Sequence, residues 1–211
     1  MSGQGGTLIQ LWQTSRISPP RVGPSGSIPA DLRQGARAGG LAIGAMFFAL
    51  FGALWLLNAD QLAHVRGWIP VALVLAVTLL LCLAAWRVLR TRRSAMRTVR
   101  DTPQAQRMRR QFRTINTLQW IAAVVVVLTL RRLHLDAWIA PAIMLIVGVH
   151  FLPLARVFRY RPHVLTGVVL IVTALLYPIA SAGGPASALG SLVSGATLWL
   201  AALWSLRPVP G

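Results

Sequence analysis

Residues 87–113 read RVLRTRRSAMRTVRDTPQAQRMRRQFR, a stretch with ten arginines and one acid, Asp101, between two long apolar segments. Arginine-rich loops of membrane proteins stay on the cytoplasmic side, because they resist translocation and are attracted to anionic lipids there. The stretch therefore predicts that the chain crosses a membrane on either side of it and that this loop faces the cytoplasm.

The composition of the chain is that of a multi-pass membrane protein. Of its 211 residues, 55% are hydrophobic and only 12% are charged. The apolar residues form six blocks, each near the ~20 residues that cross a hydrocarbon core of ~30 Å as a helix. We predict an all-α membrane domain over residues 38–206. Its six transmembrane helices are expected at 38–58, 68–86, 114–131, 137–155, 163–180 and 188–206.

Arginine placement predicts the orientation of these spans. If the amino terminus is cytoplasmic, eighteen of the twenty-one arginines lie inside and only Arg66, Arg131 and Arg132 lie outside. Residues 1–37, rich in proline and glycine, are then a disordered basic cytoplasmic tail, and residues 207–211 a short second tail. Every base is Arg and every acid is Asp, a bias typical of GC-rich bacterial genes, so we expect a bacterial inner membrane.

Two pairs of spans show an internal resemblance. His64 and Trp68 precede the second span much as His134 and Trp138 precede the fourth, and the basic exits 87–92 and 156–161 also look alike. Duplication of a two-span hairpin explains this pattern. Interfacial Trp and cytoplasmic Arg are common to most spans, so independent origin explains it equally well.

The central loop is predicted to form a cytoplasmic helical hairpin over residues 87–113. Four arginines recur at helical spacing and share one face: Arg90, Arg93, Arg97 and Arg100. Thr102 is suited to N-cap a following helix with Pro103 at its first position. The arginine face either only orients the protein in the membrane, or it also binds anionic lipid or an acidic protein partner. Nucleic acid ranks last, because no aromatic residues interleave with the arginines.

One ionisable residue, His150, falls well inside a predicted span. Pro153 should free a backbone carbonyl in the same turn, and Gly148 allows a neighbouring helix close. With Thr173 and Tyr177 of the fifth span, these residues form a candidate intramembrane polar site. The alternative is a neutral histidine that hydrogen-bonds another helix.

Small residues predict where helices pack closely. Gly40, Gly44 and Gly52 form one such strip in the first span. A second strip in the last span comprises Gly190, Ser194 and Thr197. We expect both strips to lie at helix–helix contacts.

Catalytic and metal-binding patterns are missing from the sequence. It has no paired carboxylates within a span and no phosphate-binding glycine loop, and its four histidines show no ligand spacing with one another or with Cys82. We therefore expect no catalytic residue, cofactor or metal. Asp60 with His64 and Asp136 with His134 leave a lipid-modifying enzyme as the least favoured function.

The segment GVHFLPLA at residues 148–155, followed by Arg156, resembles one found in small, uncharacterised bacterial multi-pass inner-membrane proteins. The resemblance implies a polar, kinked fourth span and no particular activity. Two functions remain open from the sequence. One is a small transporter or channel, or a subunit of one. The other is a non-catalytic scaffold whose arginine hairpin binds lipids or a protein partner. Both functions are compatible with a homo-oligomer.

Overall fold

The computed structural model describes residues 28–64 and 67–207. Every regular element in these ranges is helical, which confirms the predicted all-α class. The long helices are α2 (Ala30–Leu62), α3 (Ile69–Arg100), α4 (Pro103–Arg132), α5 (Ile139–Phe158), α6 (Pro162–Ala180) and α7 (Ala188–Ser205). Two 3₁₀ helices, η1 (Asp136–Trp138) and η2 (Gly184–Ala186), lie between α4 and α5 and between α6 and α7.

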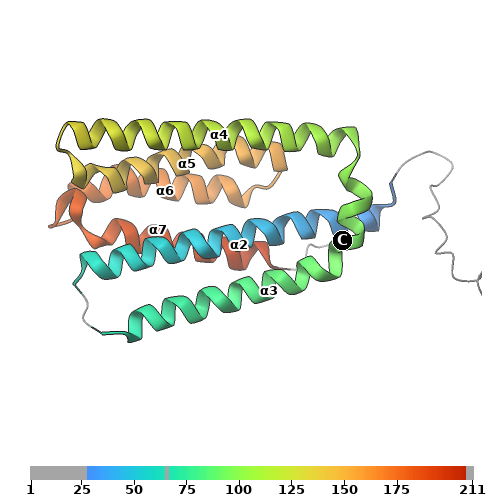
Figure 1. The fold of residues 1–211 in the computed structure, drawn as a ribbon, viewed down its shortest axis with the longest axis horizontal. Helices are drawn as coiled ribbons and strands as arrows, with labels where there is room; N and C mark the ends of the chain where they lie inside the picture. Colours follow the sequence, from blue (N-terminus) through green and yellow to red (C-terminus); the bar gives the residue numbers. More distant parts are fainter. Residues whose placement is uncertain (1–27, 65–66, 208–211) are drawn as a thin grey trace, which may run out of the picture.

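Successive helices run in opposite directions through the bundle (Figure 1). The α4–α5 and α6–α7 connections lie at one end together with the end of α2 and the start of α3; we call this the loop end. The α3–α4 and α5–α6 connections lie at the other end, which we call the arginine end. The three connections at the loop end are short, as expected where consecutive antiparallel helices are neighbours.

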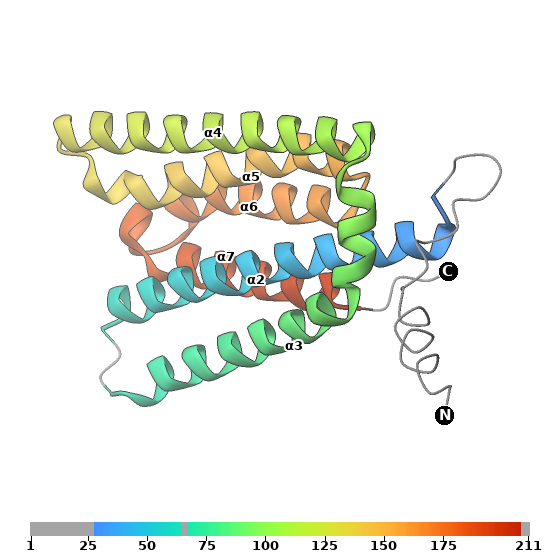
Figure 2. The same cartoon turned by 45° about the vertical axis from the view of Figure 1, so that its right-hand side comes forward.

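Helix α2 lies at the centre of one half of the bundle and packs against α3 and α7. In the other half α5 packs against α4 and α6, and α6 packs against α7. The halves also meet at Phe48 and Phe151, whose ring centroids are 5.4 Å apart. Helices α3 and α4 are edge helices on opposite sides of the bundle (Figure 2).

The bundle places small residues inside and large apolar residues outside. Ala42, Ala49, Ala85 and Ala202 are fully buried, whereas each long helix exposes at least one large apolar side chain, most of them leucines, isoleucines, valines and tryptophans. Such an apolar exterior is stable in hydrocarbon, where the backbone must satisfy its own hydrogen bonds within helices. All six long helices of the described residues are long and apolar enough to cross a membrane. These features are compatible with a multi-pass integral membrane protein.

The six helices fall into two length classes. Helices α2, α3 and α4 contain 33, 32 and 30 residues, whereas α5, α6 and α7 contain 20, 19 and 18. At 1.5 Å per residue the short class spans about 27–30 Å, close to the thickness of a hydrocarbon core. The additional turns of the long class extend beyond that length, chiefly at the arginine end (Figure 1).

The first helix begins earlier than the sequence predicts. Residues 30–37, expected to be part of a disordered tail, are the first two turns of α2. The cause is packing against α3: Gly35 and Gly39 are buried, and a Cβ on them would lie 3.0 Å from the Ala95 Cβ and against the Met96 side chain. Residues 1–27 of the predicted tail lie outside the described residues, as do residues 208–211.

The turn between α3 and α4 forms as predicted, but the two helices do not form a hairpin stem. Thr102 is the N-cap of α4 and accepts a hydrogen bond from the Ala105 amide, with Pro103 in the first turn. Beyond this turn α3 and α4 make little contact, because α3 packs on α2 and α4 packs on α5. The chain instead crosses the arginine end from one edge of the bundle to the other (Figure 2).

Removing the cap should loosen the start of α4. We expect Thr102→Ala to cost about 1 kcal/mol locally, because the Ala105 amide loses its acceptor. Hydrogen exchange at Ala105 and Gln106 should accelerate several-fold, with little change in overall melting temperature. Thr98→Ala is the matched control, since the Thr98 hydroxyl donates within α3 to Ser94 and caps no helix. Equal exchange in the two variants would contradict the capping role.

Close packing uses different glycines from those predicted in the first span. A Cβ on Gly40 or Gly44 would meet nothing within 4 Å, so the prediction of contact at these two residues is wrong. Gly52 does pack closely, against Gly195 and Trp199 of α7. Four-residue spacing alone did not reveal which stripe of α2 faces its neighbours; the buried stripe passes through Gly35, Gly39 and Gly52.

The internal resemblance holds at the loop end and fails at the arginine end. His64 and His134 both adopt the left-handed conformation just after a helix, with φ of 52° and 56°. Trp68 and Trp138 both precede the next helix, each with φ of −84°. At the other end the predicted match is wrong, because residues 87–92 lie within α3 whereas α5 ends at Phe158.

Candidate functional site

The arginine end carries a concentrated positive charge. Sixteen described arginines lie there, and all are exposed. They are Arg33, Arg37, Arg87, Arg90, Arg92, Arg93, Arg97, Arg100, Arg107, Arg109, Arg110, Arg113, Arg156, Arg159, Arg161 and Arg207. The described acids at this end are only Asp31 and Asp101. Arg131 and Arg132 at the loop end are matched in number by Asp60 and Asp136, so the charge difference between the ends is large.

The positive charge at the arginine end is not neutralised by ion pairs. Among the described residues the one salt bridge joins Arg131 to Asp136 at 4.0 Å, and it lies at the loop end. The guanidinium of Arg207 instead stacks 4.4 Å from the Trp204 ring, and that of Arg93 lies 5.8 Å from the Trp86 ring. These arginines therefore remain available to anions outside the chain.

The four arginines predicted to share a face lie on one continuous helix. Arg90, Arg93, Arg97 and Arg100 all belong to α3 and all are exposed. The opposite side of the same turns is anchored, since Ala95 is buried against Gly35. The arginine face is thus presented by a helix held rigidly against α2.

His150 is positioned by α5 with one ring nitrogen buried and unsatisfied. Its Nδ1 has no hydrogen-bond partner in the described part of the chain. The ring contacts the edge of Phe151, with centroids 5.8 Å apart, and lies beside the backbone of Ile115 in α4. Gly148, two residues away, brings α5 against α6: a Cβ there would lie 3.0 Å from the Gly167 carbonyl oxygen. Pro153 lies inside α5, as predicted.

One predicted partner of His150, Tyr177, has other contacts. The Tyr177 hydroxyl donates a hydrogen bond to the Pro185 carbonyl at 3.1 Å, at the loop end, and the Tyr177 ring packs on Gly190 of α7. Thr173 is half-buried one turn of α6 before Tyr177. The structure therefore brings Gly148 and Pro153 together with His150 on one helix, and it separates Tyr177 from them.

A second histidine belongs to the surroundings of His150. His163, in the first turn of α6, is only 6% exposed and contacts the rings of Phe48, Phe151, Phe158 and Tyr160 at centroid distances of 4.8–6.3 Å. Sequence analysis did not connect His163 with His150. The sequence pattern that could have connected the two histidines is the pair Phe151 and Phe158, which are seven residues apart and therefore share one face of α5.

Tyr160 closes this aromatic cluster between α5 and α6, outside the spans. Burial raises the pKa of Tyr160 above its ordinary value, while the Ser205 hydroxyl and the charge of Arg37 act in the opposite direction. The phenol is therefore neutral at physiological pH and is a hydrogen-bonding group at the arginine end.

Replacing His150 by leucine should stabilise the protein. An unsatisfied buried nitrogen costs roughly 1–3 kcal/mol, and leucine removes it while filling similar space. Leucine also removes the hydrogen-bonding interaction of the ring with the Ile115 backbone, worth roughly 1 kcal/mol, so the net gain is smaller than the full cost of the nitrogen. A gain of about 1 kcal/mol corresponds to a rise in melting temperature of about 3 °C for a chain of this size. His150→Gln, which keeps a polar side chain, is the control and should not be stabilised. A leucine variant that melts below the glutamine variant would show that the ring makes a hydrogen bond that the packing requires.

The described structure defines a class, a six-helix bundle fit for a membrane, with one strongly basic end. Comparisons with protein-family models, with curated proteins and with solved structures found no match. The resemblance of the segment 148–155 to small bacterial membrane proteins therefore stays a prediction.

Proposed function

We propose that the protein is a multi-pass inner-membrane scaffold that lies with its arginine end at the cytoplasmic leaflet and binds anionic phospholipid headgroups there. The observation that carries the proposal is the set of sixteen exposed arginines against two aspartates at one end of the bundle. Each Lys or Arg near an anionic leaflet contributes about 1 kcal/mol of attraction, so a cluster of this size binds firmly.

Rigid presentation also supports lipid binding by the arginine end. The arginine face of α3 is anchored through Ala95 and Gly35, and α4 begins at the capped turn at Thr102. Headgroups can then bridge arginines of both helices without the ordering cost that a disordered basic segment pays. The arrangement needs no catalytic group.

Lipid selectivity of the purified protein tests this function. The full chain should be incubated with equimolar phosphatidylglycerol and phosphatidylcholine and examined by native mass spectrometry. We expect phosphatidylglycerol to be retained preferentially, and the preference to fall with added salt, because exposed charges are screened. Equal retention of the two lipids would remove the proposal. A co-purified acidic protein in place of lipid would favour the protein-partner alternative.

Topology reporters test the orientation on which the proposal depends. Fusions after Gly211 and within the Asp101–Thr102 turn should report cytoplasm, and a fusion between Ala182 and Gly183 should report periplasm. We expect these locations because arginines at the cytoplasmic ends of the spans outnumber those at the opposite ends. A periplasmic signal from the Asp101–Thr102 turn would overturn the orientation.

A small transporter or channel, or a subunit of one, is the second candidate. Two buried polar atoms favour it: His150 Nδ1 and Ser194 Oγ have no hydrogen-bond partner among the described residues. Unsatisfied polar groups at membrane depth often mark a path for ions or substrates. Proton flux into liposomes containing the protein, measured with a pH-sensitive dye, tests this candidate. Flux that His150→Leu abolishes would support it, and flux no greater than that of empty liposomes would exclude proton transport.

A further inference from the structure

Helix α4 contains polar side chains for which the chain provides no interface. Of the six spans, α4 and α7 have the least hydrophobic membrane segments, and α7 is also the span with the largest buried share. The polarity of α7 belongs to its interface with α2, where Asn58 donates a hydrogen bond to the Ser191 hydroxyl. Helix α4, in contrast, has no buried residue, so its polar side chains lie at no comparable interface within the described chain.

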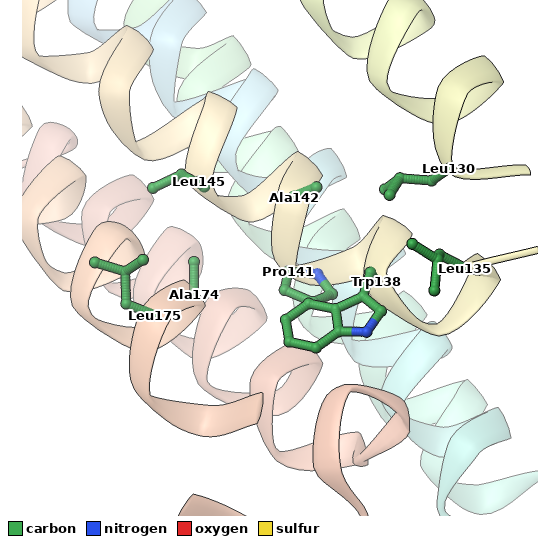
Figure 3. A pocket seen from close by; sticks show the side chains of 8 residues that line it. All are labelled: Leu130, Leu135, Trp138, Pro141, Ala142, Leu145, Ala174 and Leu175. Atoms are coloured by element: carbon green, nitrogen blue, oxygen red, sulfur yellow. The ribbon is translucent and has the colours of Figure 1, made fainter. Parts of the chain in front are cut away.

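Few parts of the chain cover α4. It packs along α5, and near the loop end an open hollow of about 370 Å³ lies between it and α6 (Figure 3). Leu130 lines the α4 side of this hollow, and Leu175 lines the α6 side. On its outer side α4 exposes large apolar side chains such as Leu118 and Leu128, as expected where a helix meets lipid or another membrane protein.

A polar patch lies among these apolar side chains. It comprises Asn116, Thr117 and Trp120, which together cover about 100° of the circumference of α4. Thr117 and Trp120 are exposed and Asn116 is half-buried. None of the three side chains makes a hydrogen bond to another described residue.

The polar patch lies at the depth of the hydrocarbon core. Ile115 of α4 lies beside His150, which is in the middle part of α5. The patch follows Ile115 within about one and a half turns toward the loop end, so it is level with the middle of α5. Water is not available there to satisfy an amide or a hydroxyl, and lipid acyl chains carry no hydrogen-bonding group. The patch therefore requires a polar neighbour.

We propose that the polar patch is the contact between two copies of this protein, in which the α4 helices pack about a two-fold axis along the membrane normal. The carboxamide of Asn116 both donates and accepts hydrogen bonds, so two symmetric copies satisfy each other. Copies inserted in the same orientation carry the patch at the same depth, as such a contact requires. Asn and Thr side chains hydrogen-bond across helices in membranes. The contact goes beyond the lipid binding proposed above and does not depend on it.

Arginines of α4 weaken this contact but do not prevent it. Arg109 and Arg113 precede the patch on the same side of the helix, so two copies place like charges near each other. Both side chains are exposed at the arginine end, where physiological salt screens charges that are more than about 8 Å apart. Their long side chains can also turn away from each other. The amide contact lies deeper, in the hydrocarbon.

Disulfide crosslinking of the full-length protein in phosphatidylcholine liposomes tests the contact. In a Cys82→Ala background, Val124→Cys places a thiol one turn beyond Trp120, on the patch side of α4. Val125→Cys is the matched control, because the two valines are 54% and 55% exposed but Val125 points about 100° further from the patch. At a lipid-to-protein ratio that prevents chance collisions, oxidation should convert the Val124→Cys protein to a dimer and leave the Val125→Cys protein monomeric.

Two results of this experiment would overturn the proposal. One is equal crosslinking of the two cysteine variants, and the other is no crosslinking of either. In native membranes, a Val124→Cys protein that crosslinks to a different protein and not to itself would overturn the second copy as the occupant.

The role of the amide is tested in the same Val124→Cys protein. Adding Asn116→Leu should raise the membrane density of protein needed for half-maximal crosslinking about tenfold, because two reciprocal interhelical hydrogen bonds are lost. Gln119→Leu is the control: it removes an amide from the same turn, but Gln119 is four residues after Ile115 and therefore lies on the α5 side. Equal effects of Asn116→Leu and Gln119→Leu would overturn the assignment of the patch. The liposomes contain no anionic lipid, so these outcomes are independent of lipid binding at the arginine end.

Discussion

Replacing Gly195 by leucine should lower the free energy of unfolding by about 3 kcal/mol, at the upper end of what overpacking costs. A Cβ at this residue would lie 2.5 Å from Leu56 Cγ and 2.8 Å from the Gly52 carbonyl oxygen. The leucine can rotate, but the carbonyl belongs to the backbone of α2 and cannot. Helices α2 and α7 must therefore move apart.

That separation breaks the polar contacts of the same interface. Asn58 donates a hydrogen bond to the Ser191 hydroxyl at 2.8 Å, and the Trp199 indole donates to the Ala49 carbonyl at 3.2 Å. In a membrane these groups find no water as a substitute. The loss should therefore be cooperative along the length of α7.

Cys82 provides the measurement. It is the single cysteine of the chain and is half-buried in α3, so a thiol-reactive fluorophore reports unfolding during heating in detergent. Gly44→Leu is the control, since a Cβ on Gly44 meets nothing within 4 Å. Gly195→Leu should melt well below wild type and Gly44→Leu close to it. Similar melting temperatures for the two variants would contradict the described α2–α7 interface.

Replacing Arg90, Arg93, Arg97 and Arg100 together with glutamine should weaken binding of anionic lipid by tenfold or more. The expectation follows from about 1 kcal/mol for each arginine near an anionic surface, reduced by screening at physiological salt. Retention of phosphatidylglycerol by the full-length variant, titrated in native mass spectrometry, provides the measurement. Stability should change little, because all four side chains are exposed.

A second set of four arginines distinguishes a specific face from general charge. Arg107, Arg109, Arg110 and Arg113 are equally exposed but belong to α4. Replacing them with glutamine removes the same charge from the same end of the molecule. If α3 presents a binding face, the α4 variant retains more phosphatidylglycerol than the α3 variant. Equal losses would show that only the total charge matters.

Local signals in the sequence predicted much of this fold. Apolar blocks located all six long helices, because the length of an apolar segment is fixed by the thickness of the hydrocarbon it crosses. The cap at Thr102, with Pro103 in the first turn, was also predicted, because capping involves only residues within one turn. Orientation within the membrane stays a prediction, since it depends on the bilayer and not on contacts within the chain.

Features that depend on partners distant in sequence were not predicted. The early start of α2 requires Ala95 and Met96 to lie against Gly35 and Gly39, which no local pattern reveals. The divergence of α3 and α4 likewise follows from the competing contacts of each helix with α2 and α5.

In the candidate polar site, too, the local feature was predicted and the long-range contacts were not. His150 was found because a lone ionisable residue in an apolar segment is visible in the sequence. Its neighbour His163 and the distance to Tyr177 depend on how α5 and α6 are aligned, which Gly148 and Gly167 determine through their close contact.

The unequal lengths of the helices have a consequence for the surrounding bilayer. The apolar part of α3, residues 69–86, contains 18 residues, as many as α7, so in a membrane both helices present about 27 Å of apolar length. The additional turns of α3, residues 87–100, carry six arginines and extend into the headgroup region without thickening the hydrocarbon. The bilayer thickness that fits the protein is therefore set by the short helices and is the same on the α3 and α7 sides, although the two sides differ in how far they reach into the headgroups.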